Sequence, residues 1–399
     1  MTQTRRDSRR HRLVVFLAAA VALVVLPFLL QIAGNAWVRI VDVALLYVLL
    51  ALGLNIVVGY AGLLDLGYVA FYAVGAYMMG LLASSQLTDN FPAIAAMFPG
   101  GLHTPWWVVI PLGALLAAGA GVVLGAPTLK LRGDYLAIVT LGFGEIVRVF
   151  VNNLDAPVNI TNGPKGISSI DEITIFGESL GKTHHPFGLD MPKVTNYYFL
   201  FVILVVLAVL ICYRLEHSRI GRAWMAIRED EIAAKAMGIN TRNLKLLAFG
   251  MGATFGGVSG VMFATFQGFI SPESFSLQES VMIVAMVVLG GIGHLPGVIV
   301  GALLLAVLPE ALRYVAGPMQ QMTGGRLDAS ILRQLFVAVA MIGVMLARPR
   351  GLWPSPEHGK SIAGAPPEHT PTNPAVPQPV GPDASEATNE DQTSGTRHA

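Results

Sequence analysis

Cysteine and charge are both scarce in this chain. Of its 399 residues one is cysteine and 13% are charged, while 54% are hydrophobic. The single cysteine, Cys212, excludes an intramolecular disulfide and any metal site of the CxxC type. Soluble domains carry roughly 25% charged residues, so such a deficit over a long chain indicates a membrane protein. The formal net charge is +1 and no basic domain stands out, so we expect no nucleic-acid partner.

A nucleotide-binding loop is also missing. The segment GESLGKT (177–183) comes nearest to the phosphate-binding pattern G-x-x-x-x-G-K-[ST]. Residue 176, where the pattern requires its first glycine, is Phe. The sequence shows no Ser-His-Asp order, zinc motif or kinase signature in a suitable context. We therefore expect a protein that is not an enzyme and that binds no cofactor.

Long apolar runs fill most of the chain. A membrane-spanning helix needs about 20 mostly apolar residues, and a scan at this length predicts about ten spans. They cover 13–33, 38–58, 66–84, 106–127, 135–151, 197–213, 244–269, 277–293, 296–316 and 331–347. The sequences GYAGLLDLG and GGIGHLPG interrupt this pattern, so the number of spans there stays open. The predicted fold class is an all-α, polytopic membrane helix bundle.

The distribution of Lys and Arg predicts the orientation. Residues 1–12 are basic, and the apolar run that follows is too long for a cleaved signal peptide. If the spans of the membrane domain, 13–350, alternate in direction, most Lys and Arg fall on the side of the N-terminus. We therefore expect both termini in the cytoplasm and a loop, 153–196, on the outer side, where the strand-like ITIF favours a small hairpin. The tail, 355–399, is rich in Pro, Thr, Glu and Ala and is predicted to be disordered.

A polar segment on the cytoplasmic side, 214–243, breaks the apolar pattern. Asp230 is typical of a helix N-cap, and Gly238 suits the position that ends a helix. The segment predicts two short amphipathic helices, joined at Glu229–Asp230 and held against the cytoplasmic face. The apolar stripe of the first helix consists of Ile220, Ala223, Trp224 and Ile227. The stripe of the second consists of Ile232, Ala233, Ala236 and Met237. On these features alone the segment is either an interfacial linker between two spans or a surface on which a cytoplasmic motor or regulator docks; its length and its caps favour docking, because connectors in a bundle are usually short.

The sequence EIAAKAMG (231–238) resembles the E-A-A…G signature of permease subunits of bacterial ATP-binding-cassette importers. Further segments resemble, in the right order, the LivM-type branched-chain amino acid permeases. They are LGLNIVVGYAGLLDLGYVAFYAVGAY (52–77), LRGDYLAIVTLGFGEIVRVF (131–150), TNGPKGI (161–167) and VVLGGIGHLPGVIVGALLLAVLPEALR (287–313). The resemblance covers roughly 40–350 and leaves out the basic head and the tail.

This resemblance implies a multi-subunit importer for Leu, Ile and Val in the bacterial inner membrane. The partners would be a second, LivH-type permease, two cytoplasmic ATPases and a periplasmic substrate-binding protein, with the lipid bilayer as surroundings. The ATPases would dock on the polar segment and push on it. The residues that we assign to this coupling are Arg228, Glu229, Asp230, Glu231, Ala233, Ala234 and Gly238.

Polar side chains within the spans are candidates for the substrate pathway, because charge in a membrane is costly. Glu145 and Arg148 share a helix face at i, i+3 and can pair, either to line the pathway or to fix helix packing. Asn55, Tyr60 and Asp65 flank a glycine-rich break, and broken helices often mark transport paths. Several glycines near the breaks are expected to allow close helix packing. They are Gly59, Gly62, Gly67, Gly75, Gly290, Gly291, Gly293 and Gly297.

Three alternatives stay open at the sequence level. A permease for urea or short amides shares much of the pattern, and substrate choice lies largely in the binding protein. A secondary transporter driven by ions or protons would be expected to show a set of intramembrane acids, for which Glu145 alone is thin support. A membrane scaffold without transport activity is the third. ATP-dependent uptake of a defined substrate discriminates among them.

Overall fold

The helices of this protein follow the apolar segments of its sequence. The computed structural model describes residues 21–99, 101–129, 131, 133–175, 177–183, 190–322, 329–348 and 351–353, all within one unit of the chain. A helix at Val21–Ala33 comes first. The long helices that follow are α2 (Asn35–Asn55), α3 (Val69–Leu82), α6 (Trp106–Thr128), α7 (Asp134–Asn152), α8 (Lys193–Glu216), α11 (Thr241–Gln267), α12 (Leu277–Gly290), α13 (Leu295–Met322) and α14 (Ala329–Ala347).

Each predicted span coincides with one of these helices, the first of them as far as it is described. Within the described residues, six helices are long and apolar enough to cross a membrane. The prediction of an all-α, multi-pass membrane protein is confirmed, whereas the total of about ten spans stays a prediction. The basic head, 1–12, and the tail, 355–399, lie outside the described residues.

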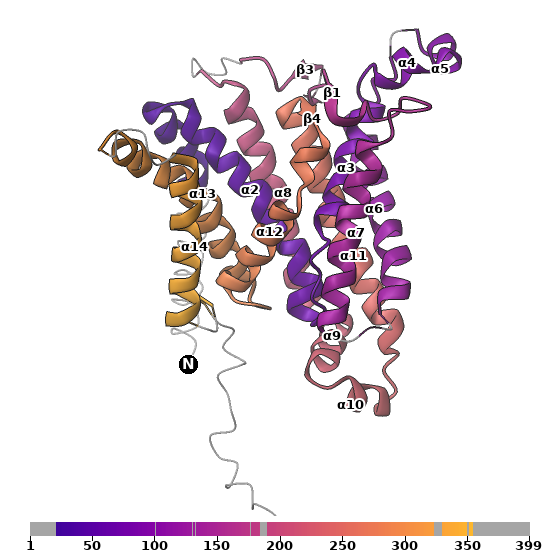
Figure 1. Cartoon of the computed structure of the whole chain (residues 1–399), viewed down its shortest axis with the longest axis vertical. Helices are drawn as coiled ribbons and strands as arrows, with labels where there is room; N and C mark the ends of the chain where they lie inside the picture. Colours follow the sequence, from indigo (N-terminus) through magenta and orange to yellow (C-terminus); the bar gives the residue numbers. More distant parts are fainter. Residues whose placement is uncertain are drawn as a thin grey trace, which may run out of the picture. The chain divides into compact units, whose positions relative to one another are not determined.

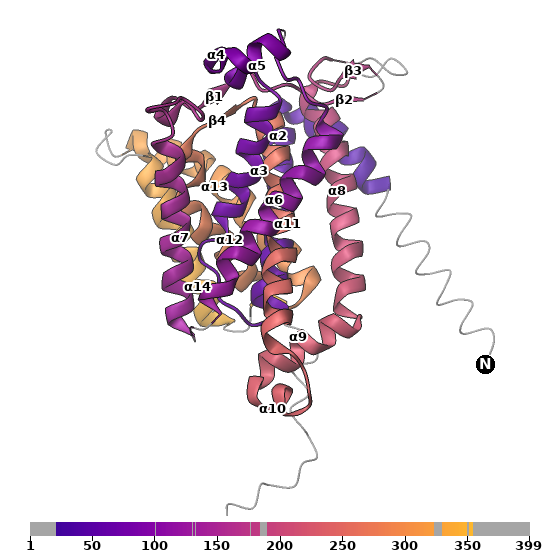
Figure 2. The same cartoon turned by 90° about the vertical axis from the view of Figure 1, so that its right-hand side faces the viewer.

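The bundle has two ends, and successive long helices run in alternate directions between them (Figures 1 and 2). One end carries two short helices, α9 (Arg219–Glu229) and α10 (Glu231–Ala236). The other end carries α4 (Gln86–Asn90), α5 (Pro92–Met97) and two small sheets. We call them the α9/α10 end and the β end.

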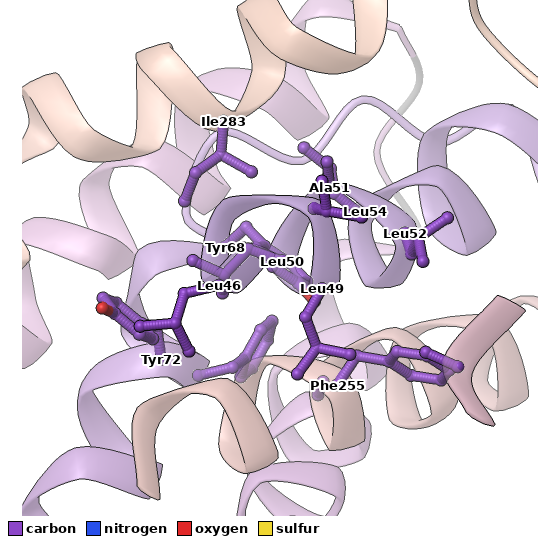
Figure 3. Close-up of a cluster of buried hydrophobic side chains, with 14 of the residues drawn as sticks. Leu46, Leu49, Leu50, Ala51, Leu52, Leu54, Tyr68, Tyr72, Phe255 and Ile283 are labelled. Atoms are coloured by element: carbon purple, nitrogen blue, oxygen red, sulfur yellow. The ribbon is translucent and has the colours of Figure 1, made fainter. Parts of the chain in front are cut away.

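Helices α2 and α11 form the centre of the bundle. In the most apolar stretch of each helix, the share of buried residues is 78% in α2 with its extension to Tyr60 and 67% in α11, but 28% in α6 and in α8. Figure 3 shows Leu46, Leu50 and Leu54 of α2 among Tyr72, Phe255 and Ile283 from neighbouring helices. Most residues of α6 and α8 in this stretch are therefore exposed or only half-buried, as expected of helices that face lipid.

Glycines set the spacing of the inner helices. A Cβ on Gly75 of α3 would lie 2.0 Å from the carbonyl oxygen of Gly257 in α11. A Cβ on Gly290 would lie 2.3 Å from the carbonyl oxygen of Gly297. Real Cβ atoms cannot approach a backbone oxygen so closely, so these helices would have to separate. The predicted role of Gly75, Gly290 and Gly297 in close packing is confirmed.

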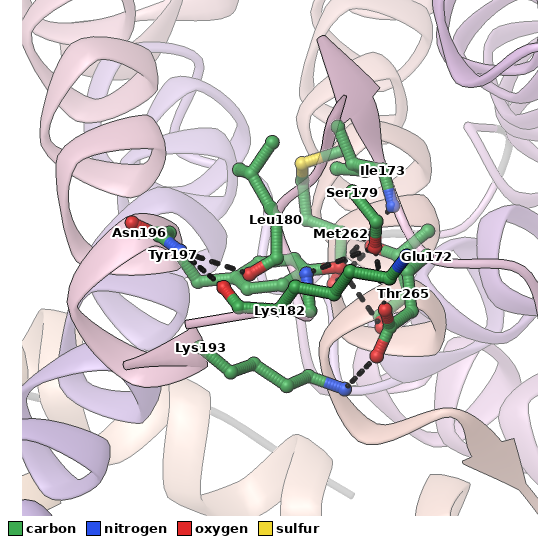
Figure 4. Close-up of polar contacts among 11 residues, drawn as sticks. Glu172, Ile173, Ser179, Leu180, Lys182, Lys193, Asn196, Tyr197, Met262 and Thr265 are labelled. Atoms are coloured by element: carbon green, nitrogen blue, oxygen red, sulfur yellow. Dashed lines mark hydrogen bonds and ion pairs between the residues drawn. The ribbon is translucent and has the colours of Figure 1, made fainter. Parts of the chain in front are cut away.

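At the β end, β1 (Ile167–Ser168) pairs antiparallel with β4 (Phe269–Ile270). Strands β2 (Thr174–Ile175) and β3 (Glu178–Ser179) form the small hairpin expected in the loop 153–196. The hairpin is fixed to the first turn of α8 by polar contacts (Figure 4). Lys193 Nζ lies 3.0 Å from Glu172 Oε1, and Ser179 Oγ donates to Glu172 Oε2 at 2.6 Å.

Both glycine-rich breaks lie toward the α9/α10 end of the bundle. After α2 the chain forms a π-helical turn, η1 (Ile56–Tyr60), and then leaves the helix before α3. The second break separates α12 from α13 and contains Gly291 and Gly293, both with positive φ. A short 3₁₀ helix, η4 (Pro272–Phe275), leads into α12 from the β end.

Candidate coupling element and pathway residues

Helix α9 packs along the apolar stripe that its sequence predicts. The Ser218 hydroxyl accepts a hydrogen bond from Gly221 N at 3.1 Å and caps the first turn. Trp224 and Ile227 of the apolar stripe are buried, and Trp224 Nε1 donates to Leu244 O at 2.7 Å. The indole therefore fastens α9 to the first turns of α11, with its polar atom satisfied.

The predicted caps of α10 are also present. Asp230 Oδ1 accepts hydrogen bonds from the backbone N–H groups of Ile232 and Ala233 at 2.7 and 3.1 Å. Gly238 has a φ of +83°, and its N–H donates to Lys235 O at 3.0 Å. This left-handed residue turns the chain toward α11, as expected of the position after a helix.

The apolar stripe of α10, unlike that of α9, does not pack on the bundle, and whether it rests against the cytoplasmic face stays a prediction. Ile232 is 75% exposed and Met237 is 82% exposed, whereas Ala234 is buried. The helix has only 6 residues, less than two turns, and the side chain of Glu231 rather than an apolar face attaches it to α11. Helix α10 itself lies at the outermost point of the α9/α10 end (Figure 2), so its exposed Ile232 and Met237 are open to a partner there.

Glu231 is an internal anchor. Its Oε2 lies 2.6 Å from Lys245 Nζ in α11, and its Oε1 lies 3.0 Å from Lys235 Nζ. Thr241 Oγ1 donates to Oε1 at 3.3 Å. The hydrogen bond from Lys245 lowers the pKa of Glu231 to about 2, against partial burial and with help from Lys235. The carboxylate is thus ionised in neutral solution and holds α10 to the start of α11.

The residues assigned to coupling divide into two groups. Arg228, Glu231 and Ala234 turn toward the protein, with Arg228 Nη1 donating to Gly59 O at 2.5 Å. The others are exposed around α10, which we call the tip; they are Glu229, Asp230, Ala233 and Gly238. A cavity of about 580 Å³ lies beside Arg228 and Glu231. It is bordered by α9, α10, the first break at 61–64 and the start of α7. The sequence alone does not indicate which of these side chains face the protein and which face outward.

The three residues around the first break are buried in packed surroundings. Asn55 Oδ1 accepts from Gly293 N at 2.9 Å, and Tyr60 Oη donates to Glu216 Oε2 at 3.3 Å. Asp65 Oδ1 accepts from Gly67 N at 2.9 Å. The cavity beside Asp65 measures only about 10 Å³. These groups hold the broken segment in place, and a pathway-lining role stays a prediction.

The predicted pair on α7 is formed. Arg148 Nε lies 2.9 Å from Glu145 Oε2, and its Nη1 lies 3.5 Å from Glu273 Oε1 in η4. Both members of the i, i+3 pair are about one third exposed. The pair borders an open apolar face of the same helix, which consists of Tyr135, Ile138, Val139, Ile146, Val149 and Phe150.

Comparison with known proteins assigns a family. Residues 37–345 match the family described as "Branched-chain amino acid transport system / permease component". The chain belongs to this family. The match spans most of the helical bundle, including α9, α10 and both breaks, and a 40% identity with a LivM protein makes this chain a LivM-type transport permease.

The relatives of this permease carry two subunit names. It is 40% identical over 353 residues to the high-affinity branched-chain amino acid transport system permease protein LivM of Escherichia coli, covering 85% of this chain and 75% of the relative. It is 27% identical over 264 residues to the LivH permease protein of Salmonella typhimurium, covering 65% of this chain and 80% of the relative. No solved structure shows a significant match. The relatives thus include two permease proteins of one kind of transport system.

The structure also reveals a buried acid in the permease that the sequence reasoning missed. Asp42 of α2 is fully buried, and neither carboxylate oxygen has a hydrogen-bond partner among the described residues. A second acid, Glu279 of α12, accepts a hydrogen bond from Tyr47 at 2.7 Å. The signal was present, because an acid within a predicted span is itself unusual.

Proposed function

We propose that this chain is the LivM-type subunit of an ATP-driven importer that carries Leu, Ile and Val across the bacterial inner membrane. The observation that supports this most is the 40% identity with a named LivM protein over 85% of the chain. The α9/α10 end faces the cytoplasm, together with both termini. The β end faces the periplasm, where a substrate-binding protein delivers the amino acid.

Two partner ATPases supply the energy through the tip formed by α10. The exposed Ile232 and Met237 supply apolar contacts, as in other short helices that insert into a groove. Glu229 and Asp230 border them on the exposed side. The internal anchors of Trp224 and Glu231 make the tip rigid enough for a push on α10 to reach α11.

The exposed face of α7 supports a pathway at the contact with a second, LivH-type permease. Glu145 and Arg148 lie on α7, which covers the predicted span 135–151, and both side chains are about one third exposed; within a membrane, lipid contact would be costly for their charge. A protein partner or a water-filled path would remove that cost. A branched-chain amino acid is an apolar zwitterion, so a path with one ion pair between apolar side chains matches its chemistry.

Reconstitution tests this proposal. The permease, the second permease, the ATPases and the binding protein are placed in proteoliposomes, and uptake of labelled leucine is measured with ATP at the ATPase side. We expect uptake that requires ATP hydrolysis, withstands a protonophore and is competed by isoleucine and valine but not by urea. Uptake that follows a proton gradient without the ATPases would overturn the importer, and competition by urea alone would overturn the substrate.

A further inference from the structure

We call α9 and α10 together the coupling segment. One side chain connects its first helix, α9, to the first helix break. Arg228 lies in the last turn of α9, and its Nη1 donates to Gly59 O, 169 residues away in the chain. Its aliphatic part lies against Gly62, where a Cβ would come within 2.7 Å of Arg228 Cγ. The guanidinium thus ends on the main chain of the broken span rather than on the exposed surface.

The carbonyl that Arg228 binds belongs to a helix end. The last carbonyl groups of a helix have no partner within the helix, and an unsatisfied one is costly inside a membrane protein. Here Ala61 N donates to Ile56 O and Leu63 N donates to Val57 O. Arg228 supplies Gly59 with a charged donor, and such hydrogen bonds are stronger than neutral ones.

The end of the first broken helix, around Gly59, also contacts the second break. The side chain of buried Asn55 accepts the hydrogen bond of Gly293 N, and Gly293 has a φ of +81°. A Cβ on Gly59 would lie 2.1 Å from Asn55 Oδ1 and 2.9 Å from Gly293 N. The two breaks are therefore in direct contact, and Arg228 lies against both, since a Cβ on Gly293 would lie 2.7 Å from its Nη1.

The second break in turn binds the segment that follows α14. Leu352 N donates to Leu289 O at 2.8 Å, and Trp353 N donates to Gly290 O at 3.2 Å. His294 Nδ1 lies 2.9 Å from Trp353 O. A displacement at Arg228 would therefore reach the ends of α2, α12, α13 and the chain beyond α14.

We propose that Arg228 is the positioning residue that transmits movement of the coupling segment to the two helix breaks, through its hydrogen bond to Gly59 and the Asn55–Gly293 contact. This inference rests on the proposed function, because it presumes that ATPases move α10. We call the group Arg228, Gly59, Asn55 and Gly293 the break junction. Its role is transmission, since none of its members needs to touch substrate or nucleotide.

The geometry separates transmission from attachment. Trp224 and Glu231 already fasten the coupling segment to α11, so α9 and α10 stay in place without the guanidinium. The cavity of about 580 Å³ beside Arg228 leaves room for the segment to shift. Removing the Arg228 hydrogen bond should therefore uncouple the segment from the breaks while the fold and the ATPase contact persist.

The first test replaces Arg228 in the reconstituted importer. We expect Arg228→Ala to assemble and hydrolyse ATP like the wild type, with leucine uptake per ATP about tenfold lower, as for the loss of a typical coupling free energy. Arg228→Lys, which keeps a charged donor, should restore most of the uptake. Arg222→Ala, an exposed arginine on the same helix, is the matched control and should not change the ratio.

A second variant reaches the junction from the other side. Gly293→Ala places a Cβ against Arg228 Nη1 and Gly59 O without altering the coupling segment, and should uncouple like Arg228→Ala. Gly268→Ala is the matched control, because its φ is +70° but a Cβ there has no neighbour within 4 Å among the described residues. We expect the Gly268→Ala permease to fold and to show the same uptake per ATP as the wild type.

A distance measurement provides a readout that a merely structural role would not move. With Cys212 replaced by Ala, spin labels at the exposed Leu64 and Leu210 report the first break against α8. We expect ATP to change this distance in the wild type and not in Arg228→Ala. If the wild type shows ATP-driven uptake and Arg228→Ala shows the same uptake per ATP and the same distance change, the inference alone is overturned. If the wild type itself shows no ATP-driven uptake, the proposed function is overturned.

Discussion

The carboxylate of Glu231 shows how one residue of the coupling segment serves the fold. Its pKa of about 2, which is mainly due to the hydrogen bond from Lys245, lies below the ordinary value of 4.5. A carboxyl with a lowered pKa in the folded state stabilises that state above its ordinary pKa, and the stabilisation is lost as the pH falls toward the folded value. The anchor should therefore be constant near neutral pH and weaken below about pH 4.

Hydrogen exchange tests this anchor. We expect Glu231→Gln to speed amide exchange in α10 about fivefold near neutral pH, since a charged hydrogen bond to Lys245 is lost. The wild type should show the same protection of α10 at pH 6 and 8, once intrinsic rates are corrected. Glu229→Gln, at an exposed neighbouring position, is the control. Equal exchange in both variants would show that Glu231 does not hold the helix.

At this scale the sequence predicts local chemistry well and direction poorly. The cap at Asp230 and the turn at Gly238 depend on neighbours within a few residues, so their roles follow from residue type and spacing. The inward course of Arg228 depends on Gly59, which lies far away in the chain. Such a contact has no local signal, and a single sequence without a fold cannot reveal it.

Helix α10 is the element on which ATPase docking depends. We expect Ile232→Asp combined with Met237→Asp to prevent copurification of the ATPases, because charge would replace the exposed apolar contacts. The thermal unfolding of the permease in detergent should stay unchanged, since both side chains are exposed. Trp224→Ala is the contrasting variant and should destabilise by about 3–5 kcal/mol through loss of a buried aromatic. Retained copurification in the double variant would move the docking site elsewhere.

The elements that the sequence predicted are those with a strong local pattern. Spans are recognisable because about 20 apolar residues are needed to cross the membrane, and each predicted range contains a helix. The short helices α4 and α5 and the pairing of β1 with β4 were missed. Ile167 pairs with Ile270 across a long sequence separation, and two-residue strands carry no periodicity.

On the scale of the whole molecule, α7 has an unusual position. It lies at the edge of the bundle and packs on α3, α12 and η4 (Figure 2). Its exposed apolar residues recur at three- and four-residue intervals, which places them on one face. Gly142 lies among them, and a Cβ there would have no neighbour within 4 Å among the described residues. A small residue in an apolar stripe allows another helix to approach closely.

This face, together with the charged pair Glu145–Arg148, leads to a prediction about assembly. We expect Gly142→Leu to fold normally but to reduce assembly with the LivH-type permease about tenfold, because the added side chain would keep a partner helix away. Native mass spectrometry of the copurified complex measures the loss. Gly119→Leu, on α6 with equally open surroundings, is the matched control and should assemble normally, because lipid accommodates a larger side chain. If both variants assemble alike, α7 faces lipid, and its ion pair serves helix packing with η4 through Glu273.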